Sequence, residues 1–283
     1  MRTTSMILIL ATLGGATPVL AQDSANDQST LPFFMRKGPT VEDALQAYRE
    51  KPYRPVRTGE QHTAPFLSEG AAMPYGKALG PTTPPKNPYG GSAAVVAIGS
   101  QFAVAPPEGG SYRPGDTLTV ATLAPSPKGA WGTIITPTGL LVVESVGDRQ
   151  TLTRVAAVYG PIRGEQVVLP TPPTVDPGRV DPIPADGPVG TLLGPHTVRA
   201  LVMSSSIMFT DLGADDGMRI GDFVSIRRDP APRVKAADTI DEEIGSAQVI
   251  HVGPTTSTIR LIEVSSGALP DGSRVVRTRT LPH

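Results

Sequence analysis

One stretch of this sequence decides its fold because it occurs twice. Arg113-Pro114-Gly115-Asp116-Thr117-Leu118-Thr119-Val120 matches Arg219-Ile220-Gly221-Asp222-Phe223-Val224-Ser225-Ile226, and at this constant offset residues 94–155 match residues 200–261 without a gap. A fixed offset over such a length indicates an internal duplication. After an insertion of two residues, Gly164 to Val168 continues the match with Gly272 to Val276.

Each copy has the composition of a small β unit. An alternating strand is followed by a Gly-Asp turn, a second strand, a variable loop, two longer strands and a closing Gly-x-x-Val-Val, so roughly five strands fit. Glycine permits positive φ at the turn, and the aspartate accepts backbone hydrogen bonds there. Short strands avoid open edges by closing into a barrel. We therefore predict an all-β protein with two tandem small, SH3-like β-barrels over 92–170 and 196–279.

The N-terminus predicts export. Arg2 precedes an apolar run from Met6 to Leu20, and Ala21 provides a small residue for cleavage before Gln22, so residues 1–21 are typical of a signal peptide. No later run has the roughly 18 apolar residues of a membrane span, so no integral membrane segment is expected after cleavage. The expected location is the periplasm, the outer cell envelope or the extracellular space.

The regions that flank the repeats are expected to be extended. Residues 22–91 are predicted as a flexible N-terminal region with one short helix over 41–50 and a Pro/Gly-rich strap over 51–91. A second proline-rich segment, 171–195, is predicted as a linker between the copies. The chain has 30 glycines and 31 prolines, which fits abundant turns and linkers.

Charge and cysteine usage exclude several classes of protein. The chain has 25 Lys and Arg against 26 Asp and Glu, without long runs of one sign, so no nucleic-acid partner is expected. The absence of cysteine excludes disulfides, thiolate metal sites and the lipid-acceptor thiol of a bacterial lipoprotein.

Tyr112-Arg113-Pro114-Gly115-Asp116-Thr117-Leu118 resembles the opening of a LysM module, which binds peptidoglycan. The pattern then departs from LysM, because Pro125 and Pro127 fall where its first helix is needed. More widely, 94–170 and 198–278 resemble the β-rich C-terminal regions of bacterial envelope proteins that often carry a LysM module upstream. That resemblance implies an association with the cell wall or the outer membrane.

The sequence offers few groups for catalysis or metal binding. It has no Gly-x-Ser-x-Gly nucleophile elbow, and its histidines are not paired at metal-ligand spacing, so no catalytic residue, cofactor or metal site is predicted. His251 lies in an alternating strand and is expected to face the surface. Ser205 within Ser204-Ser205-Ser206, or Asp222, is the residue on which a hydrolase would depend.

Two aromatic residues are the candidate ligand-binding side chains. Trp131, the single tryptophan, and Tyr159 are suited to stack on a sugar ring, although packing against the barrel is the alternative. The first hypothesis is a non-enzymatic envelope scaffold or binding module with an envelope protein or peptidoglycan as its partner. The alternatives are a peptidoglycan- or glycan-binding protein and an envelope hydrolase.

Overall fold

The computed structural model shows a chain built almost entirely of strands. The described residues are 55–71, 73–83, 96–126, 131–174, 176, 181–197, 202–228, 242–265 and 269–282. They contain the helix α2 (Thr58–Thr63), the 3-10 helix η3 (Ala214–Asp216) and the strands β1 (Phe66–Leu67), β2 (Gly76–Pro81), β3 (Gln101–Ala105), β4 (Thr117–Pro125), β5 (Thr133–Val146), β6 (Thr151–Val158), β7 (Val167–Pro170), β8 (Ile183–Pro184), β9 (Val189–Pro195), β10 (Ile207–Thr210), β11 (Phe223–Arg227), β12 (Glu243–Val252), β13 (Ser257–Val264) and β14 (Arg274–Thr280). The all-β prediction is confirmed, whereas the predicted signal peptide 1–21 and helix 41–50 lie outside the described residues.

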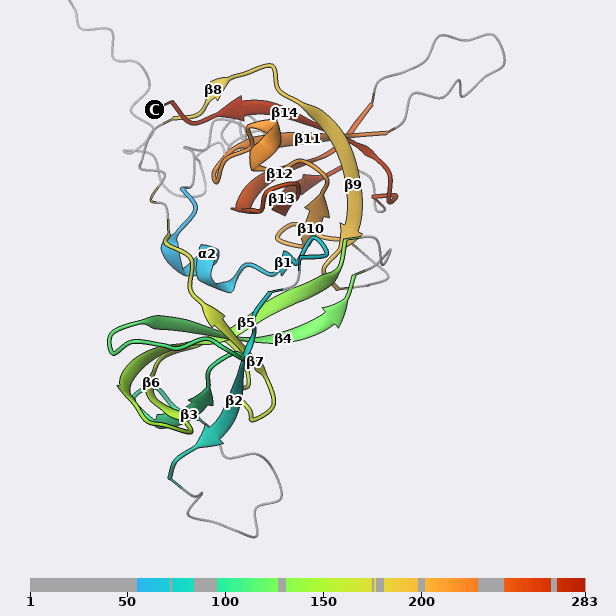
Figure 1. Cartoon of the computed structure of the whole chain (residues 1–283). Coiled ribbons are helices and arrows are strands. Elements are labelled where there is room, and N and C mark those ends of the chain that lie inside the picture. Colours follow the sequence, from blue (N-terminus) through green and yellow to red (C-terminus); the bar gives the residue numbers. More distant parts are fainter. Residues whose placement is uncertain are drawn as a thin grey trace, which may run out of the picture. The chain divides into compact units, whose positions relative to one another are not determined.

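The strands form two sheets (Figure 1). In each sheet six strands follow one another as neighbours, and the last of the six pairs with the first. In the second sheet the order β11-β12-β13-β10-β9-β14 is joined end to end by a β11–β14 pairing, which closes a barrel of 6 strands. In the first sheet the order β5-β4-β7-β2-β3-β6 is joined in the same way by a β5–β6 pairing. The short strands β1 and β8 are added to these rings through β5 and β14.

The two rings place equivalent strands in the same order. We call β2 to β7 the first repeat and β9 to β14 the second repeat. With β2 to β7 matched in turn to β9 to β14, every pairing in one ring has its counterpart in the other. The sequence offset places β6 on β13 from end to end. An identical order of neighbours in both sheets is what a duplication produces.

The first strand of each repeat lies before the region where the two copies match in sequence. β2 falls inside the predicted strap and β9 inside the predicted linker, so the expectation of about five strands and extended flanks was wrong at these two places. The strands end alike, in Leu79-Gly80-Pro81 and Leu193-Gly194-Pro195, with φ of 133° at Gly80 and 137° at Gly194. Proline is tolerated there because it stands at the strand end.

The last strand corrects the predicted alignment by one residue. Val120 of β4 pairs with Val168, whereas Ile226, its counterpart in β11, pairs with Val275 and not with Val276. A single inserted residue therefore separates the copies here. The residue with positive φ that precedes β7 is Glu165 (φ 71°), and the one that precedes β14 is Gly272 (φ 87°). These two residues are equivalent only when the single insertion is included.

Each repeat has its own hydrophobic core. The first is centred on Phe102, Leu118, Val120, Leu141 and Val155, and the second on Met208, Val224, Ile226, Ile259 and Leu261. Several of these are equivalent pairs, such as Val120 with Ile226 and Val155 with Leu261. Burying each such side chain contributes about 1.5–3 kcal/mol, so each repeat holds a substantial share of its stability internally.

Residues 55–71, which we call the bridging segment, contact both repeats. On the first repeat, β1 pairs with β5 through Phe66 opposite Ile135 and Leu67 opposite Ile134. Leu67 also belongs to a buried cluster that contains Phe209 of the second repeat. This segment was expected to be part of an extended strap, but its apolar residues Val56, Ala64 and Leu67 are buried and order it.

Two glutamates of the bridging segment attach it to the second repeat. The Glu69 carboxylate accepts hydrogen bonds from the Thr256 hydroxyl at 2.7 Å, the Thr256 amide at 2.8 Å and the Thr255 amide at 3.1 Å. Glu60 forms an ion pair with Arg260, which also donates to Gln248 at 2.8 Å. Hydrogen bonds to a charged acceptor contribute about 1.5–3 kcal/mol, so the Glu69 contact is a principal attachment.

Replacing Glu69 is therefore expected to destabilise the protein. Glu69→Ala removes the hydrogen bonds that the Glu69 carboxylate accepts from Thr255 and Thr256, and we expect the free energy of unfolding in a urea titration to fall by about 2 kcal/mol. Glu165→Ala is the matched control, because Glu165 also has positive φ but its side chain forms an exposed ion pair with Lys77. The control should change stability by less than about 0.5 kcal/mol, and equal losses in the two variants would contradict this role of Glu69.

Candidate functional site

The two Gly-Asp turns have a structural use in both repeats. The Arg113 amide donates to Asp116 at 2.7 Å, and the Arg219 amide donates to Asp222 at 3.0 Å. The glycine before each aspartate is left-handed, with φ of 93° at Gly115. The turn that resembles LysM is therefore a strand-initiating turn, as the duplication predicted.

Asp222, one of the two hydrolase candidates, is fully occupied by its own repeat. Its side chain is completely buried, and the Thr280 hydroxyl donates to it at 2.8 Å. The Arg277 guanidinium lies 3.5 Å from its other oxygen, which also accepts from Arg219. A buried carboxylate paired in this way anchors β14 beside the turn and presents no free oxygen to a substrate.

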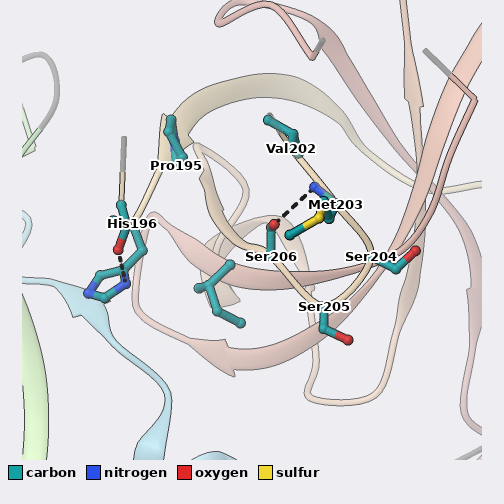
Figure 2. Close-up of a pocket in the computed structure, with 9 residues that line it drawn as sticks. Pro195, His196, Val202, Met203, Ser204, Ser205 and Ser206 are labelled. Atoms are coloured by element: carbon teal, nitrogen blue, oxygen red, sulfur yellow. Dashed lines mark hydrogen bonds between the residues drawn. The ribbon is translucent and has the colours of Figure 1, made fainter. Parts of the chain in front are cut away.

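The other hydrolase candidate, Ser205, is the left-handed residue of a tight turn. It is exposed with φ of 70°, and its counterpart in the first repeat is Gly99 with φ of 84°. The neighbouring Ser206 hydroxyl accepts the Met203 amide at 3.2 Å, which Figure 2 shows. The same contact joins Ser100 to Ala97 in the first repeat, so these serines shape a turn that occurs twice.

These serines line a pocket of about 260 Å³ together with His196 (Figure 2). Both ring nitrogens of His196 are engaged elsewhere, since the Thr136 hydroxyl lies 3.0 Å from Nε2 and the Thr197 hydroxyl 3.2 Å from Nδ1. Burial lowers the pKa of His196 below its ordinary value. A general base must reach the hydroxyl that it activates, and this imidazole is held by two threonines instead.

Trp131 and Tyr159, the predicted ligand-binding residues, lie in different surroundings. Trp131 is half-buried and packs on the cluster of Leu67 and Phe209, and its carbonyl accepts the Glu69 amide at 3.1 Å. Tyr159 is also half-buried, and burial raises the pKa of its hydroxyl. Neither residue lines the pocket beside His196 or a larger pocket between the repeats.

A larger pocket of about 540 Å³ lies between the repeats and the bridging segment. The bridging segment contributes Phe66, the first repeat contributes Leu169, and the second contributes Ile220 and His251. Residues 171–174 and the C-terminal Leu281 complete its walls. Pockets of 300–1,000 Å³ that are mainly apolar with a few polar groups are typical of ligand sites, and they are frequent between domains.

His251 is the polar group most altered by this environment. Its ring stacks on Phe66 with centroids 4.7 Å apart and an angle of 14° between the planes. Burial lowers the pKa of His251 to about 4, against the opposing effect of the Glu69 carboxylate. The expectation that this histidine faces the surface was wrong, because the bridging segment covers the strand that carries it.

Sequence reasoning missed this pocket because its walls come from segments far apart in the chain. Phe66, Leu169 and Leu281 have no shared motif, and their meeting depends on the ring order of both sheets. The proline pair at Pro172-Pro173 was a local signal, but it predicted only a linker. No group of His, Asp or Glu within the described residues is arranged to hold a metal ion.

No protein-family model matches the chain, and no curated protein matches it at a significant level. In the part of the chain that the structure describes, no helix has the length and apolar character needed to cross a membrane.

The lowered pKa of His251 predicts a loss of stability in acid. Because the folded state holds the neutral imidazole, its contribution is present above pH 6.5 and is lost as the pH falls from 6.5 towards 4. The full shift corresponds to about 3 kcal/mol. Urea titrations between pH 8 and about 4.5 should show a shallower loss for His251→Gln than for the unaltered protein, and His62→Gln, in the same pocket, should keep the full loss. An unchanged slope in His251→Gln would refute the assignment.

Proposed function

We propose that this chain is an exported, non-enzymatic protein of the bacterial cell envelope, in which two tandem SH3-like barrels act as a scaffold or binding module. The observation that carries the proposal is the use of the repeated polar residues. Asp116, Asp222, Ser100 and Ser206 all accept backbone amides in turns that occur in both repeats. The polar residues that the two copies share therefore maintain the backbone conformation of these turns.

The bridging segment supports a scaffold in particular. Its contacts to both repeats, through β1 on one side and Glu60 and Glu69 on the other, join two barrels into one compact unit within residues 52–283. Two linked barrels present more surface than either alone, and a stable protein interface needs about 800 Å² from each partner. The resemblance to envelope proteins with LysM modules favours a partner at the cell wall or outer membrane.

Peptidoglycan or glycan binding is the alternative that Trp131 favours. Trp131 is half-buried, so part of the residue is accessible to solvent, and an accessible tryptophan can stack on a sugar. A hydrolase is less well supported, because the candidate Asp222 is buried in an ion pair. Substitution of Ser205 or Asp222 remains the test of that activity.

Export is tested by the mature N-terminus. We expect protein recovered from the envelope to begin at Gln22, as measured by N-terminal sequencing and intact mass. Leu10→Arg interrupts the apolar run of the signal and should leave the full-length chain in the cytoplasm. Protein that remains uncleaved in the envelope would contradict the proposed signal peptide.

A scaffold and a glycan-binding protein are expected to bind different components of the envelope. Chemical crosslinking in intact cells should join the scaffold to one envelope protein, whereas purified sacculi should not retain the isolated chain. Trp131→Ala and the matched exposed substitution Leu123→Ala separate the outcomes further. Retention on sacculi that Trp131→Ala abolishes and Leu123→Ala preserves would replace the scaffold with the glycan binder.

A further inference from the structure

The pocket between the repeats has walls that are mostly carbon. Phe66, Leu169, Ile220 and Leu281 contribute aromatic or aliphatic surface, and four prolines line it as well: Pro137, Pro172, Pro173 and Pro282. A prolyl side chain carries no hydrogen-bond donor. Contact with this surface favours a ligand whose body is apolar, at about 25 cal/mol per Å² of apolar area buried.

The pocket also has one available positive charge. Arg219 lines it and is exposed, and its guanidinium forms no hydrogen bond or ion pair with the described part of the chain. Its backbone amide is fixed by Asp222, so the position of the residue is set by the Gly-Asp turn. The acidic residue of the same pocket, Asp176, already has an interaction of its own.

His251 and Thr119, two other polar residues of the pocket, add no charge at neutral pH. The low pKa of His251 keeps its imidazole neutral, and its ring is held against Phe66. The Thr119 and Thr171 hydroxyls are joined by a hydrogen bond, with 2.8 Å between their oxygens. A guanidinium at the wall of an apolar cavity is the arrangement that a carboxylate, sulfonate or phosphate group complements.

We propose that this pocket binds a small amphiphile, with its apolar body against Phe66, Leu169 and Ile220 and its anionic group at Arg219. The ligand class covers single acyl chains with an acidic head and aromatic acids of similar size. This site is distinct from the protein- or glycan-binding surface proposed above, and it does not depend on which partner the scaffold has.

Two fluorescent probes with nearly the same rings separate the apolar and the charged part of the proposal. Anilinonaphthalene sulfonate carries an anionic group, whereas phenylnaphthylamine is uncharged. Both are titrated into the folded full chain at pH 7.5, with near-ultraviolet circular dichroism to verify its packing. We expect each probe to bind at one site per chain, and the sulfonate to bind more tightly.

The duplication supplies a matched pair of charge variants. Arg219→Gln should weaken the sulfonate by about tenfold, which corresponds to about 1.4 kcal/mol, and leave phenylnaphthylamine unchanged. Arg113→Gln alters the equivalent residue of the first repeat, which lines neither pocket, and should change neither probe. Equal effects of the two arginine variants on the sulfonate would overturn the anionic half of the proposal.

A variant that fills the cavity tests the location. Thr174 is exposed and lines the pocket, so Thr174→Trp places bulk in it without disturbing either core, and both probes should bind at least tenfold more weakly. Val189→Trp, at an exposed position outside the pocket, should leave both affinities unchanged. Undiminished binding to Thr174→Trp, or no binding of either probe to the unaltered chain, would overturn the proposal.

A fatty acid and an aromatic acid then distinguish the two kinds of ligand. Dodecanoate and naphthalene carboxylate are each added to the chain carrying the bound sulfonate probe, and the loss of fluorescence measures displacement. Displacement by either acid in the unaltered chain that is weaker in Arg219→Gln would support the site. It would also show whether the site takes a fatty acid or an aromatic acid. Failure of both acids to displace the probe would overturn the proposed ligand class, whereas the crosslinking experiment tests the scaffold separately.

Discussion

The attachment of the bridging segment to both repeats at once is the constraint on which the rest of this structure depends. Glu69 satisfies the amides of the Thr255-Thr256 hairpin while the strand beside it adds to β5. Each half of this arrangement uses a different chemistry, a charged acceptor on one side and a β ladder on the other. Because α2 and Phe66 belong to the same segment, the same contacts also place the walls of the larger pocket.

The two repeats share a backbone and differ in how they use it. The aspartate of the Gly-Asp turn is half-buried in the first repeat and completely buried beside Arg277 in the second. Arg219, three residues before Asp222, lines the larger pocket together with residues of η3 and the bridging segment, whereas its counterpart Arg113 lines neither of the two pockets. A common scaffold has thus acquired an asymmetric surface, which is how repeated folds usually gain specificity.

The sequence was informative where its patterns were local. The alternating apolar residues and the Gly-Asp turns predicted β structure, and residues such as Val120 and Ile226 proved to be core residues. β2 and β9 were missed because each ends in a proline and their few apolar residues look like strap and linker. The shared Leu-Gly-Pro ending was the available signal. The environment of His251 was beyond local reasoning, because its burial depends on Phe66, which is far away in the chain.

The positions that hold glycine in one copy and another residue in the other show which feature of the backbone is shared. One left-handed position is Gly99 in the first repeat and Ser205 in the second, and another is Glu165 in the first and Gly272 in the second. A side chain in this conformation costs roughly 1–2 kcal/mol. Each copy has therefore accepted strain where the other has none, and neither has altered the path of its main chain. Between the two copies, the dihedral angles of these corners are more alike than the residues that occupy them.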